Sequence, residues 1–540
     1  MSQPFVIEPH APRAGFYRCL FNGATTQLLS TLRSTVGALT TGGVWIVPFD
    51  RIVHVADAAK ACGYTPQGGV YKIEEQEIKV PKEVYPHQIR GISRGLEQRR
   101  IMLNFKPGLG KTATALLTMK TAGVARALIV CPAIVRDTWA QQFAMWWPKA
   151  MHEVQIVETG KEAVAANAPF VVVSYELMSK VAHQDWNAVV MDECHYLKTA
   201  GSKRAKEAAM VTDWRRLSND ALRLWLTGTP IANEPIDLHN QVELLYPSLW
   251  GSIHDFKRRY CLSRDNPRAY SGKEYYGVNP RFAVELRERL DAVSVTATED
   301  EVASLIEKPT FEPIRVRPSR AFNIREYLAN FDRRDSHNAK SGDAIRACGI
   351  AKIEHVLALV RNDLAGGSTH IAVMTHLKAT AYEIADALAG EGVPVVCITG
   401  KDDHKKRHAE IARAVKEKHA IFVATMHCVS TGINELKDFP DVIYAELDYR
   451  PDEVVQSMKR FPRIGSKART RFRVLILEGT LEERVAKSVG RKLRDQKMIS
   501  DVGTLAGDLE GALDERISDE EFYTRIQEAA AKMTTRDVYA

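Results

Sequence analysis

A glycine-rich run at residues 106–112, Lys-Pro-Gly-Leu-Gly-Lys-Thr, constrains the fold of this chain more than any other feature. An apolar stretch, residues 101–103, precedes the run, and helix-forming residues 113–117 follow it. A strand, a glycine-rich turn that ends in Lys-Thr, and a helix together form the setting of a phosphate-binding loop. At Gly108 and Gly110 the backbone N–H groups could approach phosphate oxygens, beside the partial positive charge of a helix N-terminus. The run therefore predicts a nucleotide-binding α/β domain.

The last two residues of the run have separate expected roles. Lys111 would reach the β- and γ-phosphates of a bound nucleotide, and Thr112 would hold Mg²⁺. Phe105 stands where the full pattern has its first glycine, so an ordinary strand–helix turn is the alternative for the run taken alone.

The bulk composition narrows the class of protein. The chain has 540 residues, more than one hydrophobic core usually supports, so we expect two or three domains. The net charge of +7 permits nucleic-acid binding without requiring it. No apolar run approaches the roughly 20 residues that span a bilayer, and the first residues lack the features of a secretory signal. The eight scattered cysteines form no CxxC pair, which is typical of reduced thiols and indicates no structural metal. We therefore expect a cytoplasmic monomer without a membrane segment.

Two stretches alternate short apolar runs with helical or polar sequence, as buried parallel strands and their connecting helices do. In the first stretch the further apolar runs are residues 127–130, 170–173, 188–191 and 224–226. In the second they are residues 370–374, 393–398, 420–424, 441–444 and 473–477. Each stretch predicts a doubly wound parallel sheet. Near the N-terminus a smaller unit is expected, with helices at residues 27–39 and 53–62 and a strand at residues 44–48.

Two adjacent carboxylates follow the apolar run at residues 188–191. The carboxyl end of a strand in a parallel sheet faces the nucleotide crevice. Asp192 would hold Mg²⁺, usually through water, and Glu193 would orient or deprotonate the attacking water. A solvated Asp-Glu pair that caps a strand is the alternative. The role of His195 stays open, and Cys194 is expected to be a packed residue because no base partner is evident.

A second loop, residues 226–233, places two threonines on either side of a glycine after the next apolar run. Thr227 and Thr229 could sense the γ-phosphate from there. The alternative is a capped turn, because Thr-Gly-Thr-Pro favours turns in any protein.

Together these stretches resemble the superfamily 2 helicase motifs, and the SWI/SNF-type ATPases that translocate on double-stranded DNA are the best match. The resemblance covers about residues 81–490. Gln88, in Pro-His-Gln, is similar to the family's adenine-recognition element, where it would read the edge of the base. Three further segments resemble motifs of this family. They are residues 128–132 with Trp139, residues 173–176, and residues 226–233 leading into residues 244–247.

The second stretch carries the remaining motifs of this resemblance. Residues 430–434, which include Gly432, resemble the motif that couples DNA to ATP, and residues 456–465 resemble the final motif. The family's arginine fingers map to Arg460 and Arg463, which would stabilise charge on the γ-phosphate in the transition state. Their spacing puts both on one face of a helix, although a solvated basic face is the alternative. Basic residues continue to residue 497, and some would face DNA phosphates, so that binding would depend on salt.

The resemblance implies an α/β protein with two RecA-like parallel-sheet lobes in tandem and a small N-terminal α/β accessory domain. The arginine-rich segment that normally closes the first lobe is not recognisable near residues 293–301. The expected domains are an accessory domain at residues 1–80, a first lobe at 81–250, a helical protrusion and linker at 251–343, a second lobe at 344–495 and an acidic tail at 496–540. The N-terminal unit resembles the accessory domains of annealing helicases, which recognise forked or branched DNA, and a generic small α/β cap is the alternative.

The implied activity is ATP- and Mg²⁺-dependent translocation on DNA, mainly duplex or forked, with roles in DNA repair or replication. The alternatives are a strand-separating DNA or RNA helicase, the motor subunit of a restriction or defence system, and a non-catalytic DNA-binding scaffold. Intact residues at the nucleotide site argue against the scaffold. The lack of long extensions points to a bacterial or phage protein.

Overall fold

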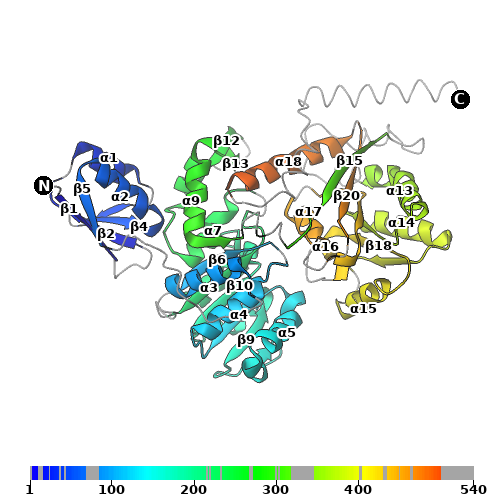
Figure 1. Cartoon of the computed structure of the whole chain (residues 1–540), viewed down its shortest axis with the longest axis horizontal. Coiled ribbons are helices and arrows are strands. Elements are labelled where there is room, and N and C mark those ends of the chain that lie inside the picture. The colour runs from blue at the N-terminus through cyan, green and yellow to red at the C-terminus, as the bar shows by residue number, and fades with distance from the viewer. Residues whose placement is uncertain are drawn as a thin grey trace. The chain divides into compact units, whose positions relative to one another are not determined.

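The chain forms two compact units in its computed structural model, one running from the N-terminus to Glu301 and the other beginning at Val302 (Figure 1). The structure describes residues 3–9, 16–23, 25–35, 38–41, 44–68, 84–106, 108–213, 217, 221–231, 234–266, 272–297, 301, 305–317, 346–400, 404–429, 435–448, 451–462, 466, 468–478 and 480–499.

The first unit contains a seven-stranded parallel sheet in the order β14-β6-β11-β10-β7-β9-β8. Its strands are β6 (Arg100–Asn104), β7 (Ala127–Cys131), β8 (Val154–Ile156), β9 (Phe170–Ser174), β10 (Ala188–Asp192), β11 (Leu222–Thr227) and β14 (Ser294–Thr296). Every residue of the five central strands is buried, because helices cover both faces of such a sheet. The expected strands are thereby confirmed. The helices are α3 (Pro86–Gln98), α4 (Lys111–Thr121), α5 (Arg136–Trp146), α6 (Lys203–Val211) and α7 (Asp237–Leu245).

Residues beyond 250 return to this sheet instead of forming only protrusions and a linker. They build α8 (Ile253–Tyr260), the hairpin of β12 (Cys261–Asp265) and β13 (Lys273–Val278), α9 (Ala283–Val293) and finally β14. β14 pairs in parallel with β6 in the segment where the arginine-rich motif was not recognisable. Phe256 and Leu286 belong to the core of the first sheet. That core therefore extends past the expected lobe boundary at residue 250.

The N-terminal unit is a five-stranded mixed sheet in the order β3-β4-β2-β1-β5. Its strands are β1 (Gln3–Pro9), β2 (Phe16–Phe21), β3 (Leu39–Thr41), β4 (Val44–Pro48) and β5 (Tyr64–Gly68), with helices α1 (Thr26–Ser34) and α2 (Ile52–Ala61). The strand and second helix expected here are confirmed. The first helix is shorter than residues 27–39, because Leu39 pairs with Ile46 in the sheet. Leu28, Leu32 and Val55 pack on the sheet to form a core of their own.

A buried ionic contact joins the N-terminal sheet to the larger sheet of the same unit. Asp50 and Arg289 are each 0% exposed, and Arg289 Nε lies 2.7 Å from Asp50 Oδ2. Trp250 Nε1 donates to the same oxygen at 3.1 Å. Phe16 and Ile46 of the N-terminal sheet are part of the core of the larger sheet. The N-terminal sheet is therefore packed onto the first parallel-sheet domain.

The second unit contains a six-stranded parallel sheet in the order β15-β20-β19-β16-β18-β17. Its strands are β15 (Thr310–Val316), β16 (His370–Thr375), β17 (Val395–Ile398), β18 (Ala420–Thr425), β19 (Asp441–Tyr444) and β20 (Arg471–Leu477). Its main helices are α13 (Ile353–Ala365), α14 (Lys378–Gly390), α15 (His404–Ala414), α17 (Pro451–Met458) and α18 (Leu481–Ile499). The expected strands and the α/β fold class with two parallel sheets are confirmed.

β15 is a strand where the sequence indicated a proline-interrupted linker. It pairs in parallel with β20 at the edge of the sheet. Pro313 is tolerated there because an edge strand has one side on which no ladder hydrogen bond is needed. The expected acidic tail lies outside the described residues from residue 500 onward.

Candidate nucleotide site

Three neighbouring strands bring the sequence motifs to one edge of the first sheet. β11 lies between β6 and β10 in the sheet. Asn104, the last residue of β6, pairs with Thr227 of β11, and Leu226 pairs with Asp192 of β10. The phosphate loop, the threonine loop and the Asp-Glu pair therefore leave the sheet side by side, at its carboxyl edge, where ligands of parallel sheets bind.

The phosphate loop folds around the Lys111 side chain. Gly108 and Gly110 have φ angles of +88° and +79°, which glycine adopts without strain. Gly110 is the N-cap of α4, and Lys111 begins the helix with 9% of its surface exposed. Lys111 Nζ donates to the Phe105 carbonyl at 3.0 Å, so the ammonium points into the loop. Pro107 lies outside the described residues.

The first turn of α3 packs against the same loop. Gln88 Oε1 accepts from the Tyr85 backbone N–H at 2.9 Å, and its Nε2 donates to the Leu109 carbonyl at 3.3 Å. His87 Nε2 lies 3.0 Å from the same carbonyl, and burial lowers the pKa of this imidazole. A Cβ at Gly110 would come within 2.0 Å of Gln88 Nε2. Glycine at position 110 therefore lets the Gln88 amide approach the loop this closely, and a Cβ there would displace the amide.

The carboxylate of Asp192 is held from several sides. It is 8% exposed, and Trp139 Nε1 donates to Oδ2 at 2.9 Å while the Glu193 backbone N–H donates to Oδ1 at 3.0 Å. The Tyr175 hydroxyl donates to the Asp192 carbonyl at 2.8 Å. Burial, followed by the negative charge of Glu193, raises the pKa of Asp192 to about 6, and the nearby Lys111 opposes this shift. Neither Trp139 nor Tyr175 was among the site residues expected from the sequence.

Glu193 has a left-handed backbone and contacts the threonine loop through a histidine. Its φ of +51° is uncommon for a residue other than glycine, and strain of this kind clusters at functional sites. Glu193 Oε2 lies 3.3 Å from His195 Nδ1, which lies 3.3 Å from Thr227 Oγ1. Thr227 Oγ1 in turn accepts from the Thr229 backbone N–H at 3.1 Å. His195, whose role the sequence left open, thus connects the Asp-Glu pair to the threonine loop.

Cys194 is a packed residue, as expected. Its Sγ donates to Gln241 Oε1 at 3.2 Å, and burial raises the pKa of the thiol well above its usual value. A nucleophilic cysteine would need a lowered pKa instead.

The donor chemistry at the sheet edge fits Mg²⁺, which prefers oxygen ligands and is usually bound by one or two protein groups plus substrate phosphates. Asp192 offers two carboxylate oxygens that each accept one hydrogen bond and keep lone pairs, and Thr112 offers a hydroxyl in the first turn of α4. Within the described ranges no group of three or more His, Cys, Asp and Glu side chains could hold a metal by itself. Mg²⁺ at this edge would be held by these side chains together with nucleotide phosphates.

In the second unit, Arg460 lies in a turn two residues past the end of α17, whereas its spacing from Arg463 predicted a helix. Arg460 is partly buried and donates its backbone N–H to the Ser457 carbonyl at 3.1 Å. Arg463 and Gly432 lie outside the described residues. Several basic residues between residues 459 and 497 have partners within the second unit, and Arg469 Nε donates to the Lys308 carbonyl at 2.7 Å. Arg473 Nη1 donates to Asp363 Oδ1 at 2.8 Å, and Arg471 pairs with Asp441 at 2.8 Å.

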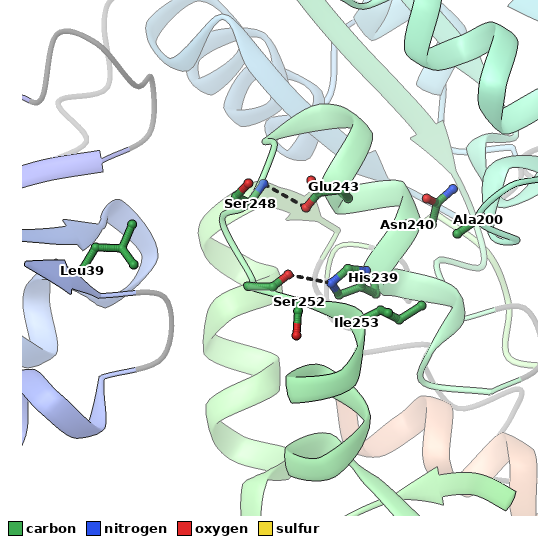
Figure 2. A pocket seen from close by; sticks show the side chains of 9 residues that line it. Leu39, Ala200, His239, Asn240, Glu243, Ser248, Ser252 and Ile253 are labelled. Carbon is green, nitrogen blue, oxygen red and sulfur yellow. Dashed lines mark hydrogen bonds between the residues drawn. The ribbon is translucent and has the colours of Figure 1, made fainter. Parts of the chain in front are cut away.

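A cavity of about 500 Å³ lies elsewhere in the first unit (Figure 2). Leu39 of the N-terminal sheet lines one side, and residues of α7 and α8 line the other. His239 Nε2 contacts the Gly251 carbonyl at 3.0 Å, and the Ser248 backbone N–H donates to Glu243 Oε2 at 2.8 Å. These polar groups serve the local fold, and the cavity shares no residue with the sheet edge described above.

Residues 71–354 match the family model of the SNF2-related domain. Since this match covers more than half of the chain, the chain belongs to the SNF2-related family and to its enzyme class, the SNF2-family DNA-dependent ATPases. The resemblance to SWI/SNF-type ATPases inferred from the motifs is thereby confirmed.

Two relatives illustrate the similarity. The SWI/SNF-related matrix-associated actin-dependent regulator of chromatin subfamily A-like protein 1 of Xenopus tropicalis is 25% identical over 460 residues, which cover 80% of this chain and 47% of that protein. The DNA annealing helicase and endonuclease ZRANB3 of Homo sapiens is 22% identical over 447 residues, which cover 76% of this chain and 40% of that protein. The chain thus covers about half or less of the length of each of these two relatives. The expectation of a bacterial or phage origin finds no support in these relatives.

Among solved structures, the Sulfolobus solfataricus SWI2/SNF2 ATPase core in complex with dsDNA matches with a TM-score of 0.38 and 19% identity, covering 84% of this chain and 99% of that chain. In the part of this chain that the structure describes, no helix has the length and apolar character to cross a membrane.

Proposed function

We propose that this protein couples ATP hydrolysis to movement on DNA, mainly double-stranded DNA, and remodels forks, branched DNA or protein–DNA complexes. The observation that carries the proposal is the meeting of the phosphate loop, the Asp-Glu pair and the threonine loop at one sheet edge, in a chain of the SNF2-related family. A relative that is named a DNA annealing helicase supports DNA as the partner.

In the first lobe, backbone N–H groups at Gly108 and Gly110 bind phosphate oxygens, and the Lys111 ammonium neutralises charge on the β- and γ-phosphates. Thr112 and Asp192 would hold Mg²⁺, which supplies further charge neutralisation at the phosphates when bound.

Glu193 orients the attacking water and accepts its proton. Its carboxylate lies 3.3 Å from His195 Nδ1, and its backbone N–H donates to Asp192 Oδ1. Gln88 recognises the adenine edge. Because its amide also bonds to the phosphate loop, base recognition and loop position are linked through one side chain.

The second lobe completes the site in this proposal. Arg460 and Arg463 act as arginine fingers on the γ-phosphate when the lobes close, and the motif containing Gly432 couples this closure to DNA. Apart from the boundaries at residues 250 and 344, past which the two sheets extend, the expected domains remain predictions, as do a monomeric state and a cytoplasmic location.

The sharpest test is Lys111→Ala. We expect ATP turnover to fall by at least about 100-fold, because the γ-phosphate loses its counter-charge, while duplex DNA binding changes by less than about threefold. Phosphate release and DNA binding by fluorescence anisotropy measure the two quantities. A Lys111→Ala protein that hydrolyses ATP at the normal rate would overturn the proposal.

Wild-type ATPase rates with single-stranded, duplex, forked and RNA cofactors identify the nucleic acid. A forked-duplex assay separates the two motor activities, since a translocase displaces a bound protein or third strand without unwinding the fork. Strand separation at the fork would favour the helicase alternative.

A further inference from the structure

We propose that Trp139 is a positioning residue of the nucleotide site, whose indole N–H holds the Asp192 carboxylate in the orientation that receives Mg²⁺. This inference rests on the proposed function, because it assigns a role to a side chain that would act only through Asp192.

The hydrogen bond from Trp139 to Asp192 is held in place by the burial of the indole ring. Trp139 lies on α5 and is 1% exposed, and its Nε1 is 2.9 Å from Asp192 Oδ2. α5 follows β7, which is the direct neighbour of β10 in the sheet. A fully buried indole cannot rotate without repacking its surroundings, so the N–H keeps its direction.

The chemistry of the donor suits a carboxylate that must also bind a cation. Indole has one N–H, no acceptor and no charge. A lysine or arginine at position 139 would offer hydrogen bonds too, but its charge would repel Mg²⁺. A histidine or glutamine would add an acceptor that competes for the metal. Trp139 therefore stabilises the buried carboxylate of Asp192 without occupying or repelling the metal.

Two donors from different elements together set the carboxylate orientation. The indole of α5 holds Oδ2, and the Glu193 backbone N–H holds Oδ1. With both oxygens held, the plane of the Asp192 carboxylate cannot turn freely. Groups that orient metal ligands in this way typically change metal affinity by about 10–100-fold when they are removed.

The chain offers a matched control in Trp225. This residue lies on β11 of the same sheet and is 0% exposed. Its Nε1 finds no hydrogen-bond partner within the described part of the chain. Trp225→Phe therefore removes the same atoms from another fully buried indole of the first unit as Trp139→Phe does, but it removes no donor to Asp192.

The experiment is an Mg²⁺ titration of fluorescent ADP binding to the full chain, with ADP affinity in EDTA measured separately. We expect Trp139→Phe to bind ADP in EDTA like the wild type, but to need at least about fivefold more Mg²⁺ for the metal-dependent gain in affinity. Trp225→Phe should match the wild type in both measurements. Circular dichroism melting verifies that each variant is folded.

A second measurement needs no variant. The chain has eight tryptophans, so ¹⁵N-labelled indoles give eight N–H signals. Adding Mn²⁺ to the ADP complex should broaden the indole signal of the residue that bonds to the metal ligand more than the others. This tests the inference even if Trp139→Phe does not fold.

The inference is overturned if Trp139→Phe has the Mg²⁺ requirement of the wild type. It is also overturned if both variants shift equally, because loss of core volume would then be the cause, or if Mn²⁺ broadens no indole signal selectively. A wild-type protein without Mg²⁺-dependent ADP binding would instead contradict the proposed function, so the two failures are distinguishable.

Discussion

At the scale of single residues, burial of Asp192 sets the pH range in which the site can work. The folded-state pKa of its carboxyl is raised from 3.8 to about 6, so the carboxylate becomes protonated as the pH falls through about 6. The protonated form cannot serve as an anionic metal ligand. We therefore expect kcat/KM for ATP, which reports the free enzyme, to fall about tenfold per pH unit below about pH 6.

The measurement is DNA-stimulated ATPase activity between pH 5 and 9, with thermal unfolding at each pH as the control for loss of fold. An acid limb near pH 4, the usual range of an exposed carboxyl, would contradict the expected pKa of Asp192.

Single residues also show how far the sequence predicts the site. Lys111, Asp192 and Glu193 could be expected together, because parallel strands end at the same sheet edge. The bond from Trp139 to Asp192 could not, since it depends on how α5 packs on the sheet. The same holds for Gln88, whose contact with the phosphate loop joins residues 21 positions apart.

At the scale of elements, the start of α4 depends on one glycine. Gly110→Ala would place a Cβ 2.0 Å from Gln88 Nε2 and would hold alanine at φ +79°. Gln88 would have to give up its hydrogen bonds to the loop carbonyls. We expect a loss of about 2 kcal/mol in the free energy of unfolding and at least about tenfold weaker ATP binding.

Gly123, just past the other end of α4, is the control for this prediction. Its φ is +65° and nothing lies within 4 Å of an added Cβ. Gly123→Ala should therefore cost about 1 kcal/mol of stability and leave ATP affinity unchanged. Equal ATP affinities in the two variants, measured by titration calorimetry, would show that the Gln88 contact does not matter for the loop.

The strands differ in how well they can be predicted from the sequence. The central strands of both sheets are built on short apolar runs and were predicted in place. β14 has only three residues, Ser294–Thr296, too few to show any periodicity. β15 contains Pro313, and a proline argues against a strand unless the strand lies at the edge of its sheet. The edge position of β15 is seen only in the structure.

At the scale of the whole first unit, the buried ion pair of Asp50 and Arg289 connects the N-terminal sheet to the domain of the larger sheet. Asp50→Ala leaves the Arg289 charge buried without its carboxylate. We expect a loss of about 3–5 kcal/mol in the free energy of unfolding of this unit, measured by urea denaturation. Asp57→Ala in the same N-terminal unit removes only an exposed pair with Lys60 and should cost less than about 1 kcal/mol.

A double variant checks that the charge is the cause. Asp50→Leu combined with Arg289→Met leaves no unpaired buried charge, so it should be more stable than either single variant. If all of these variants match Asp57→Ala, the contact between the two sheets contributes little to folding.

The short strands β14 and β15 decide where the polypeptide can be cut for separate production of its halves. β14 covers the edge of β6, and β15 covers the edge of β20, where Phe311 stacks on Phe472 at 5.1 Å between ring centroids. A fragment that stops at residue 250 lacks β14 and leaves the edge of β6 unpaired, and one that starts at residue 344 lacks β15 and leaves the edge of β20 unpaired. An unpaired edge of this kind is a template for aggregation during expression. Cutting between residues 301 and 308 keeps both sheets whole, so fragments with that boundary are the ones to express for crystallisation.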